Sequence, residues 1–313
     1  MQTSGISVVF PLIAIMLAGY LAGYFRLLEE SASKALGRFV FLVAMPPFIF
    51  ISLARISVDE FFNWPFLAVL GGGMLAVFCI SFFVARYAFP DSMAAHGLHA
   101  LTAMFSSTAY IGLPVILVIF GVEGLAPAVV GAVITVAVFM PLTIFIVEID
   151  RGRARKKIVA TALVALLRNP LLPATVAGLL TSASGVDVPV TVAMFCDLLG
   201  DAFIPCALFA AGLFVSRCSV KGDAIEISWL VFAKLILHPL ITWWLAFHVF
   251  ELEGALPMIA VLQAALPSGV PVFVLAQNYN TFVARSSAAI VVSTSLSVLT
   301  LPVLLLFFMR YGW

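Results

Sequence analysis

The chain has 313 residues, of which 64% are hydrophobic and only 10% are charged, and its mean hydropathy is +1.19. Soluble domains carry about a quarter charged residues, so this composition excludes a soluble protein and predicts that lipid surrounds the whole chain. The near balance of 16 basic and 15 acidic residues, with no basic stripe, argues against a nucleic-acid partner. The four cysteines show no CxxC spacing, so we expect neither a disulfide framework nor a metal site.

Apolar runs long enough to cross a bilayer recur along the whole sequence. A spanning helix needs about 20 predominantly apolar residues, and the stretches between the runs are shorter than the ~50 residues that a small soluble domain needs. The sequence therefore predicts an all-α membrane protein with ten transmembrane helices, over residues 6–25, 36–54, 66–88, 98–120, 125–148, 169–184, 191–215, 227–250, 255–278 and 284–309.

The lysines and arginines predict how these helices are oriented. All but three of them fall in alternate connections between the predicted spans, and the segment 150–168 carries the densest cluster. Cytoplasmic loops of membrane proteins are enriched in Lys and Arg. We therefore expect a multi-pass protein of the cell membrane with the basic 150–168 loop in the cytoplasm and both termini outside.

The prolines indicate an internal repeat. The 150–168 loop separates two halves, 1–149 and 169–313, with five predicted helices each, and an odd number of helices per half makes the two halves inverted. Three motifs of the first half recur 157 to 161 positions later: Gly112-Leu113-Pro114 as Gly269-Val270-Pro271, Met45-Pro46 as Ile204-Pro205, and Pro141 as Pro302.

One of these repeated motifs predicts a pair of broken helices. Proline inside a helix removes a backbone donor and clashes with the carbonyl four residues back, so the spans 98–120 and 255–278 should be interrupted near their middles. Matched breaks in inverted halves point to a midplane site at which half-helix N-termini attract an anion. The residues expected to line it are Gly112, Pro114, Pro267, Ser268, Gly269 and Pro271. The alternative is a pair of kinks that only help packing.

Polar side chains beside the first break are further candidates for the site. Ser107 and Thr108 precede Gly112, and their hydroxyls are suited to contact a carboxylate. The alternative is that these hydroxyls bond to their own helix, as Ser and Thr often do in membranes.

Ionisable residues inside spans are costly and therefore informative. Asp197 and Asp201 lie four positions apart, which places them on one helix face, and Lys234 and His238 have the same spacing on the next span. One reading is a proton relay or cation site that couples transport to H⁺ or Na⁺. The other is a buried structural ion pair, such as Asp201 with Lys234.

The segment from Ala265 to Gln277 (ALPSGVPVFVLAQ), followed by Tyr279, resembles the auxin efflux carrier family of transporters. The resemblance extends to Ile111-Gly112-Leu113-Pro114 and to the stretch from Lys234 to Pro239, and it covers essentially the full length. Many relatives carry Asn where this chain has Ser107.

The resemblance implies two inverted five-helix repeats, similar to the fold of sodium/proton antiporters and bile-acid symporters. In that fold, spans four and nine cross at the proline breaks, and a transport part moves against a scaffold part as an elevator does. The resemblance also implies small carboxylate substrates and a homodimer.

Together these features predict a secondary active transporter of the elevator type, which moves malonate or another small carboxylate with H⁺ or Na⁺ as coupling ion and uses no cofactor. A cation/proton antiporter with Asp197 and Asp201 as its ion site is the first alternative, and a channel is the second. An intramembrane enzyme is the third. The sequence contains no HExxH, GxSxG or Walker A motif, so we expect no enzymatic activity and no catalytic residue.

Overall fold

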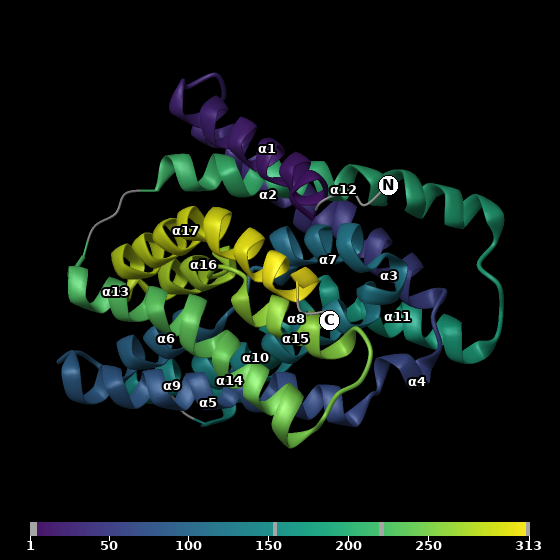
Figure 1. Ribbon diagram of the computed structural model, residues 1–313. Helices are drawn as coiled ribbons and strands as arrows, with labels where there is room; N and C mark the ends of the chain where they lie inside the picture. The colour runs from purple at the N-terminus through teal and green to yellow at the C-terminus, as the bar shows by residue number, and fades with distance from the viewer. Residues whose placement is uncertain (1–4, 153–154, 219–221, 311–313) are drawn as a thin grey trace. The chain divides into compact units, whose positions relative to one another are not determined.

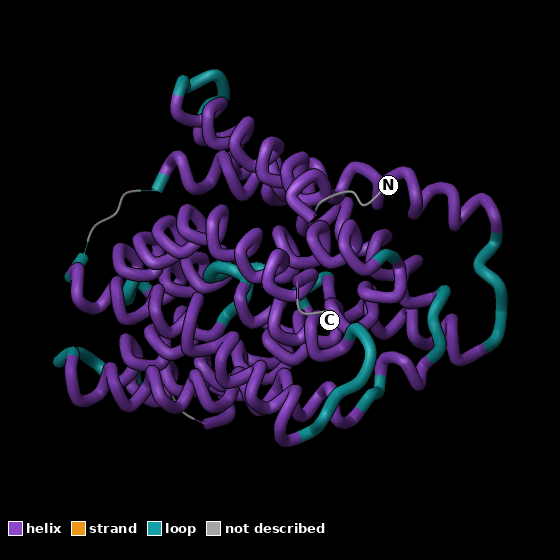
Figure 2. The backbone as a smooth tube through the Cα atoms, viewed as in Figure 1, coloured by secondary structure: helices purple, strands orange, loops and turns teal. Residues whose placement is uncertain are grey.

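A computed structural model describes residues 5–152, 155–218 and 222–310. Within these ranges the regular secondary structure consists of helices, and there is no β-strand (Figures 1 and 2). The predicted all-α class is therefore confirmed. The α-helices are α1 (Gly5–Tyr24), α2 (Glu30–Phe39), α3 (Met45–Ala54), α4 (Val58–Phe61), α5 (Trp64–Ala88), α6 (Met93–Met104), α7 (Leu113–Phe120), α8 (Leu125–Ile134), α9 (Met140–Asp150), α10 (Arg155–Leu167), α11 (Leu171–Ser184), α12 (Val190–Arg217), α13 (Ala224–Phe232), α14 (His238–Trp244), α15 (Leu256–Ala265), α16 (Val270–Tyr279) and α17 (Val283–Arg310).

Short π-helical segments interrupt the longer helices. They are η1 (Val40–Ala44), η2 (Thr108–Gly112), η4 (Thr135–Phe139), η5 (Ala233–Leu237) and η6 (Leu245–Val249), and a single 3₁₀ turn, η3 (Val122–Gly124), precedes α8. A proline lies two residues after the end of η1, η2, η4 and η5, at Pro46, Pro114, Pro141 and Pro239 respectively. The wider π turn moves the preceding carbonyls out of the register in which the proline ring would clash. The helix therefore continues through the proline.

The described helices belong to two compact units, and each unit draws on both halves of the sequence. Unit 1 consists of Met1–Asn63, Ala109–Val130 and Asn169–Arg217, and unit 2 consists of Trp64–Thr108, Gly131–Arg168 and Cys218–Trp313. Segments that are distant in sequence thus fold together within each unit.

Unit 1 is organised around the long helix α12. Helix α1 runs along α12, and α3 packs against both α11 and α12. Glycines allow α1 and α12 to touch through their backbones. A Cβ atom at Gly19 would lie 2.1 Å from the carbonyl oxygen of Phe209, and one at Gly212 would lie 1.8 Å from that of Met16. No side chain fits at either position.

Unit 2 is built around α6, which packs against α5 and α9. Leu98 and Leu101 of α6, Val77 of α5 and Val147 of α9 are all fully buried in its core. Helices α14 and α15 also pack together in this unit, and α16 packs on α17. These contacts fix the ends of α6 and α15, which carry the functional site.

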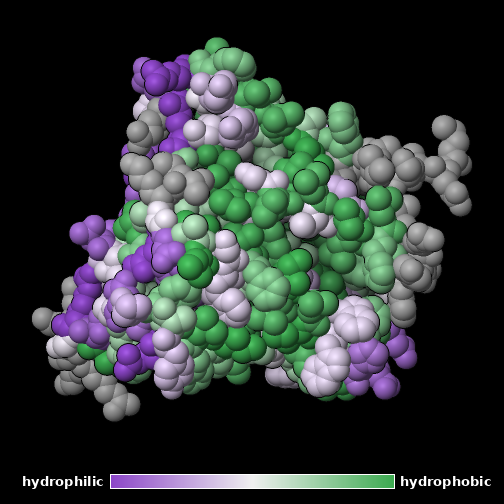
Figure 3. Space-filling model, turned by 60° about the vertical axis from the view of Figure 1, so that its left-hand side comes forward, coloured by the Kyte–Doolittle hydropathy of each residue, from purple (hydrophilic) through white to green (hydrophobic). Residues whose placement is uncertain are grey.

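The outer surface is suited to lipid. Large apolar side chains such as Leu180, Val190 and Leu198 in unit 1 and Leu299 in unit 2 are more than half exposed. On the face shown in Figure 3, hydrophobic residues cover most of the surface and hydrophilic ones gather toward its margins. Exposed apolar patches on this scale are rare in soluble monomers.

Six described helical stretches are long and apolar enough to cross a membrane, and a seventh qualifies if α10 and α11 form one span bent by 62°. Three of the predicted spans correspond to shorter apolar helices, namely Phe10–Tyr24, Thr108–Phe120 and Leu256–Ala265. The last two of these are halves of broken helices. The predicted count of ten spans therefore stays a prediction.

The segment 150–168 differs from the loop expected there. Its described part contains α10, which packs against α9. Residues 153–154 lie outside the described part of the chain. The Ala-, Leu- and Val-rich stretch from Ile158 to Leu167 favours a helix, although its basic residues suggested a connection.

We predict that Gly212→Ala destabilises the protein. The added methyl group overlaps the backbone of α1 and costs about 1–3 kcal/mol through overpacking. Gly37→Ala in α2 is the matched control, because a Cβ at Gly37 has no atom within 4 Å. Thermal unfolding in detergent should show a lower midpoint for Gly212→Ala and an unchanged or raised midpoint for Gly37→Ala. Equal midpoints for the two variants would contradict the close approach of α1 and α12.

Candidate functional site: the crossing of two broken helices

Two helix interruptions meet inside unit 2. The chain is non-helical over 105–107, after α6, and over 266–269, after α15. The two extended segments run antiparallel and form an isolated bridge between Ser106 and Ser268. The predicted pair of broken helices is therefore present, and its two breaks lie against each other.

Backbone hydrogen bonds hold the crossing together. The N–H of Ser107 donates to the carbonyl oxygen of Pro267 at 2.9 Å, and the N–H of Gly269 donates to that of Phe105 at 3.0 Å. A Cβ at Gly269 would lie 2.6 Å from Cδ1 of the Phe105 ring. Glycine at position 269 is thus required by the close approach of the two chains.

The first break lies upstream of the position expected from the repeated motif. Gly112 ends the π-helical segment η2, and Pro114 is the second residue of α7, so both have helical backbone. Proline is tolerated in the first turn of a helix, where its missing N–H would have no partner anyway. The interruption falls at 105–107 instead, where the backbone pairs with the second break.

Ser268 is fixed by two neighbouring helices. Its hydroxyl donates to the carbonyl oxygen of Thr102 in α6 at 3.0 Å, and its N–H donates to Oγ of Ser293 in α17 at 3.1 Å. Pro271 is the second residue of α16, and Gly269 is the N-cap of that helix. The second break is therefore anchored to α6 and α17 and leads directly into the N-terminus of α16.

Lys234 is a fully buried lysine beside the crossing. Its Nζ donates to Oγ of Ser106 at 2.8 Å and to the carbonyl oxygen of Ala264 at 2.7 Å, and it lies 3.0 Å from Nδ1 of His238. No carboxylate within the described part of unit 2 pairs with it. The amine thus connects the first break, the last turn of α15 and His238.

The contact between Lys234 and His238 involves one exchangeable proton. An ammonium donates to an unprotonated Nδ1, whereas a neutral amine accepts from an Nδ1–H. The sequence predicted that these two residues share one helix face, and in the structure their side chains lie 3.0 Å apart. Both side chains are buried, so this contact lies in the protein interior.

Ser107 and Thr108 are buried, and the structure shows no hydrogen bond from their hydroxyls to another described residue. Neither side chain makes a hydrogen bond to any other described residue, whereas the hydroxyls of Ser106 and Ser268 are both engaged. The structure therefore shows no hydrogen bond from either hydroxyl to its own helix, which was the alternative interpretation. Two hydroxyl groups thus remain for a ligand next to the crossing.

The two acidic candidates belong to unit 1. Asp197 forms a bidentate salt bridge with Arg55. The Nη1 and Nη2 groups of Arg55 donate to Oδ1 and Oδ2 of Asp197 at 3.0 and 2.8 Å, and both side chains are nearly half exposed. Hydrogen bonding to Asp197 raises the pKa of the Arg55 guanidinium despite partial desolvation. Asp201 lies exposed on α12. The acidic pair and the Lys234–His238 pair are therefore parts of different units.

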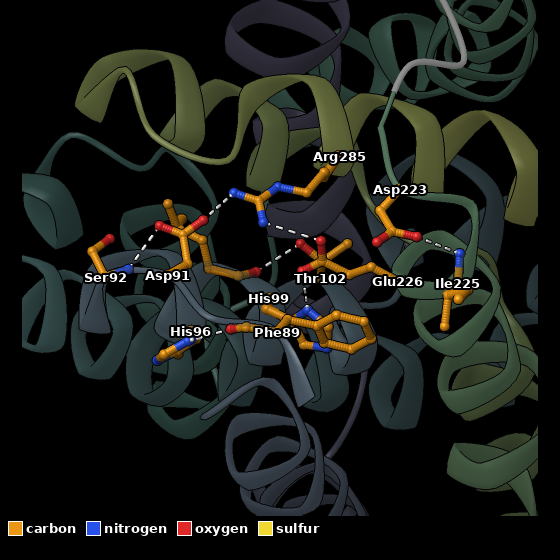
Figure 4. A network of polar contacts seen from close by, with 11 residues as sticks. Phe89, Asp91, Ser92, His96, His99, Thr102, Asp223, Ile225, Glu226 and Arg285 are labelled. Atoms are coloured by element: carbon orange, nitrogen blue, oxygen red, sulfur yellow. Dashed lines mark hydrogen bonds and ion pairs between the residues drawn. The ribbon is translucent and has the colours of Figure 1, made fainter. Parts of the chain in front are cut away.

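A second polar cluster in unit 2 was not predicted from the sequence (Figure 4). Glu226 of α13 is buried and accepts from Nδ1 of His99 in α6 at 2.9 Å and from Arg285 in α17 at 3.0 Å. Arg285 also pairs with Asp91, in the connection before α6, at 2.5 Å. Glu226 directly precedes the predicted span 227–250 and Arg285 is the second residue of 284–309, so both resemble ordinary loop charges in the sequence. The histidine inside the span 98–120 was the available signal.

The side-chain exposure falls along this cluster from the surface to the interior. Asp91 is 33% exposed, Arg285 25%, Glu226 4% and His99 1%. The His99 ring lies between Phe89 and Phe282, with ring centroids 5.7 and 5.8 Å away. Its Nε2 makes no hydrogen bond to any described residue. The neutral Nδ1–H tautomer fits this setting, because a protonated Nε2 would be a buried donor without an acceptor.

Asp91 is the outermost group of the cluster. Partial burial opposes its ionisation, but hydrogen bonds from Arg285 and from the N–H of Ser92 outweigh this effect and hold its pKa below the usual value of 3.8. A lowered carboxyl pKa means that the stabilisation is present above the ordinary aspartate pKa and is lost as the pH falls through the folded-state value. The link between Asp91 and Arg285 is thus intact at neutral pH.

We predict that Glu226→Ala destabilises unit 2 much more than Asp91→Ala does. Removing Glu226 leaves His99 and Arg285 without their shared buried acceptor, which costs about 3 kcal/mol. Asp91 is partly exposed, so its removal should cost at most about 1 kcal/mol. Unfolding of the purified protein in detergent, by heat or by denaturant, measures the difference. Similar losses in the two variants would show that the buried bonds of Glu226 contribute nothing beyond a surface ion pair.

Comparison with known proteins identifies the family of this chain. The model of the family described as "Membrane transport protein" matches residues 4–305. A Rhizobium meliloti (strain 1021) protein named "Putative malonate transporter" is 28% identical over 95% of this chain and 93% of its own length. "Uncharacterized transporter YfdV" of Escherichia coli (strain K12) is 26% identical over 96% of this chain and 97% of its own. "Probable auxin efflux carrier component 1b" of Oryza sativa subsp. japonica is 29% identical over 47% of this chain and 27% of its own. The chain therefore belongs to this family of membrane transport proteins, the auxin efflux carrier family, and is a membrane transporter.

Proposed function

We propose that this transporter is a secondary active carrier for a small organic anion, with malonate as the first candidate. The observation that carries the proposal is that Ser107 and Thr108, two buried residues at the crossing of the two broken helices, make no side-chain hydrogen bond to a described residue. Hydroxyl donors, a buried lysine and the start of a helix together favour a carboxylate.

The charges around the crossing fit an anion better than a neutral ligand. Helix α16 begins at Val270, immediately after the second break, and a helix N-terminus carries a partial positive charge. Lys234 adds a full positive charge when it is protonated, and no carboxylate of the described part of unit 2 neutralises it. Malonate, which appears in the name of the Rhizobium meliloti relative, is a small dicarboxylate and therefore an anion.

Substrate movement in this proposal follows the elevator scheme. The substrate-binding set predicted from the sequence is Ser107, Thr108, Pro267, Ser268, Gly269 and Pro271, all in unit 2, together with Gly112 and Pro114, which belong to unit 1. One compact unit carries the crossing and moves, while the other serves as the scaffold. Ten spans in two inverted repeats, termini outside the cell, a cytoplasmic 150–168 segment and a homodimer complete the proposed architecture.

Coupling is proposed to run through the proton shared by Lys234 and His238. The two acidic residues, Asp197 and Asp201, remain candidates for a separate ion site. Arg55 already fills the position beside Asp197, so an antiporter that relies on both aspartates must first displace a guanidinium. This observation favours the organic-anion carrier over cation/proton antiport.

We predict that the purified protein, reconstituted in liposomes, takes up radiolabelled malonate in a saturable manner. Ser107→Ala and Thr108→Val should each raise KM about five-fold, the equivalent of one lost hydrogen bond of ~1 kcal/mol. Thr181→Val is the matched control, because the Thr181 hydroxyl donates to the carbonyl oxygen of Ala177 in its own helix, α11. Uptake should respond to an imposed pH gradient.

Several results would count against the carrier. Folded protein that takes up neither malonate nor other small carboxylates would remove the proposed substrate class. Sodium/proton exchange without carboxylate uptake, abolished by Asp201→Asn, would establish the antiporter instead. Uptake that never saturates and shows no counterflow would indicate a channel.

A further inference from the structure

The amine of Lys234 has the surroundings of a bound cation. Three acceptors lie within 3.0 Å of Nζ: the Ser106 hydroxyl, the Ala264 carbonyl and Nδ1 of His238. An ammonium group has three N–H donors, so each donor has one acceptor. The side chain is fully buried, and its three protein partners satisfy its hydrogen-bonding capacity without water.

The carbonyl that Lys234 contacts belongs to the end of a half-helix. Ala264 is in the last turn of α15, which ends at Ala265, and the last four carbonyls of a helix lack intrahelical partners. Such a terminus carries a partial negative charge of roughly half an elementary charge. In transporters with broken helices, the C-terminal ends of half-helices and unwound carbonyls coordinate Na⁺ or H⁺. In this chain the covalently attached amine of Lys234 lies at that place.

The third acceptor distinguishes an ammonium from an alkali metal ion. Hard metal cations take oxygen ligands, whereas the Nδ1 lone pair of His238 suits an N–H donor. The π-helical segment η5 carries Lys234, and His238 follows as the first residue of α14. Lys234 and His238 are therefore about one helical turn apart, and their side chains meet on the same side of the helix. The acceptor set is matched to an amine.

We propose that the ammonium group of Lys234 is a tethered cation that takes the place of Na⁺ at the crossing, so that the carrier works without a sodium ion. The inference rests on the proposed carrier function only for its transport readout. In its ammonium form Lys234 supplies the positive charge that balances the end of α15 and favours an anionic substrate. Sodium ions have no vacant position at this half-helix end, and a proton is the ion left to couple transport.

The first test is thermal unfolding of the full-length protein in detergent, which does not depend on the substrate. Wild-type protein should have the same midpoint in sodium chloride as in choline chloride of equal ionic strength. Lys234→Ala should unfold at a lower temperature in choline chloride, and methylammonium chloride should raise its midpoint in a saturable manner by refilling the vacated position. Lys34→Ala, which changes an exposed lysine of α2, is the control and should ignore methylammonium.

The second test is malonate uptake by reconstituted wild-type protein with choline in place of sodium on both sides of the membrane. Unchanged uptake supports the tethered cation. Saturable stabilisation of the wild type by sodium, or a loss of uptake of about ten-fold or more without sodium, overturns it. A folded Lys234→Ala that ignores methylammonium and keeps the wild-type midpoint also overturns it.

The unfolding test and the uptake test together distinguish failure of this inference from failure of the carrier proposal. If malonate is not transported, the proposed substrate fails, but the midpoints of the wild type in sodium and choline still decide whether Lys234 replaces the ion. If Lys234→Ala does not fold, the same wild-type comparison decides the question alone.

Discussion

The pairing of two unwound segments is the constraint on which the rest of unit 2 depends. A polar backbone group without a partner costs several kcal/mol in a hydrocarbon environment, so a broken helix needs something to bind its exposed N–H and C=O groups. Here each break supplies the partners of the other, through Ser107 to Pro267 and Gly269 to Phe105. Neither break is stable without the other. Because Ser106 also accepts from Lys234, the crossing and the buried amine form one arrangement.

Prolines set the register that brings the buried amine to this point. Pro239 follows η5, and the π-helical turn ahead of it contains Lys234. In a regular α-helix the ring of Pro239 would meet the carbonyl of Leu235 four residues back. The wider turn relieves that clash and changes the direction in which the preceding side chains point. The same combination of π turn and proline in η2 keeps the chain helical at Pro114, which moves the first interruption upstream to the serines.

The features that were predictable from the sequence are those fixed by local chemistry. The apolar composition predicts the helical membrane class, and the proline cluster at 267–271 predicts the second break. The spacing of Lys234 and His238 predicts that they share one helix face, but not that their side chains touch. The local sequence does not determine the position of the first break, because that position depends on which residues face the second break in space. The cluster of His99, Glu226 and Arg285 escaped detection for a similar reason, since charges at span ends are usually solvated. Only the tertiary packing of α6, α13 and α17 shows them to be partners.

Charge and hydrogen-bond geometry are divided between different residues at the crossing. All three donors of a protonated Lys234 are already engaged by Ser106, Ala264 and His238, so the amine contributes positive charge but no free N–H to a ligand. The groups left to orient a carboxylate are the hydroxyls of Ser107 and Thr108 together with the first turn of α16. In the proposed carrier, substitutions at 107 and 108 should therefore alter which carboxylate is selected, while those at 234 and 238 should alter the ion that drives its movement.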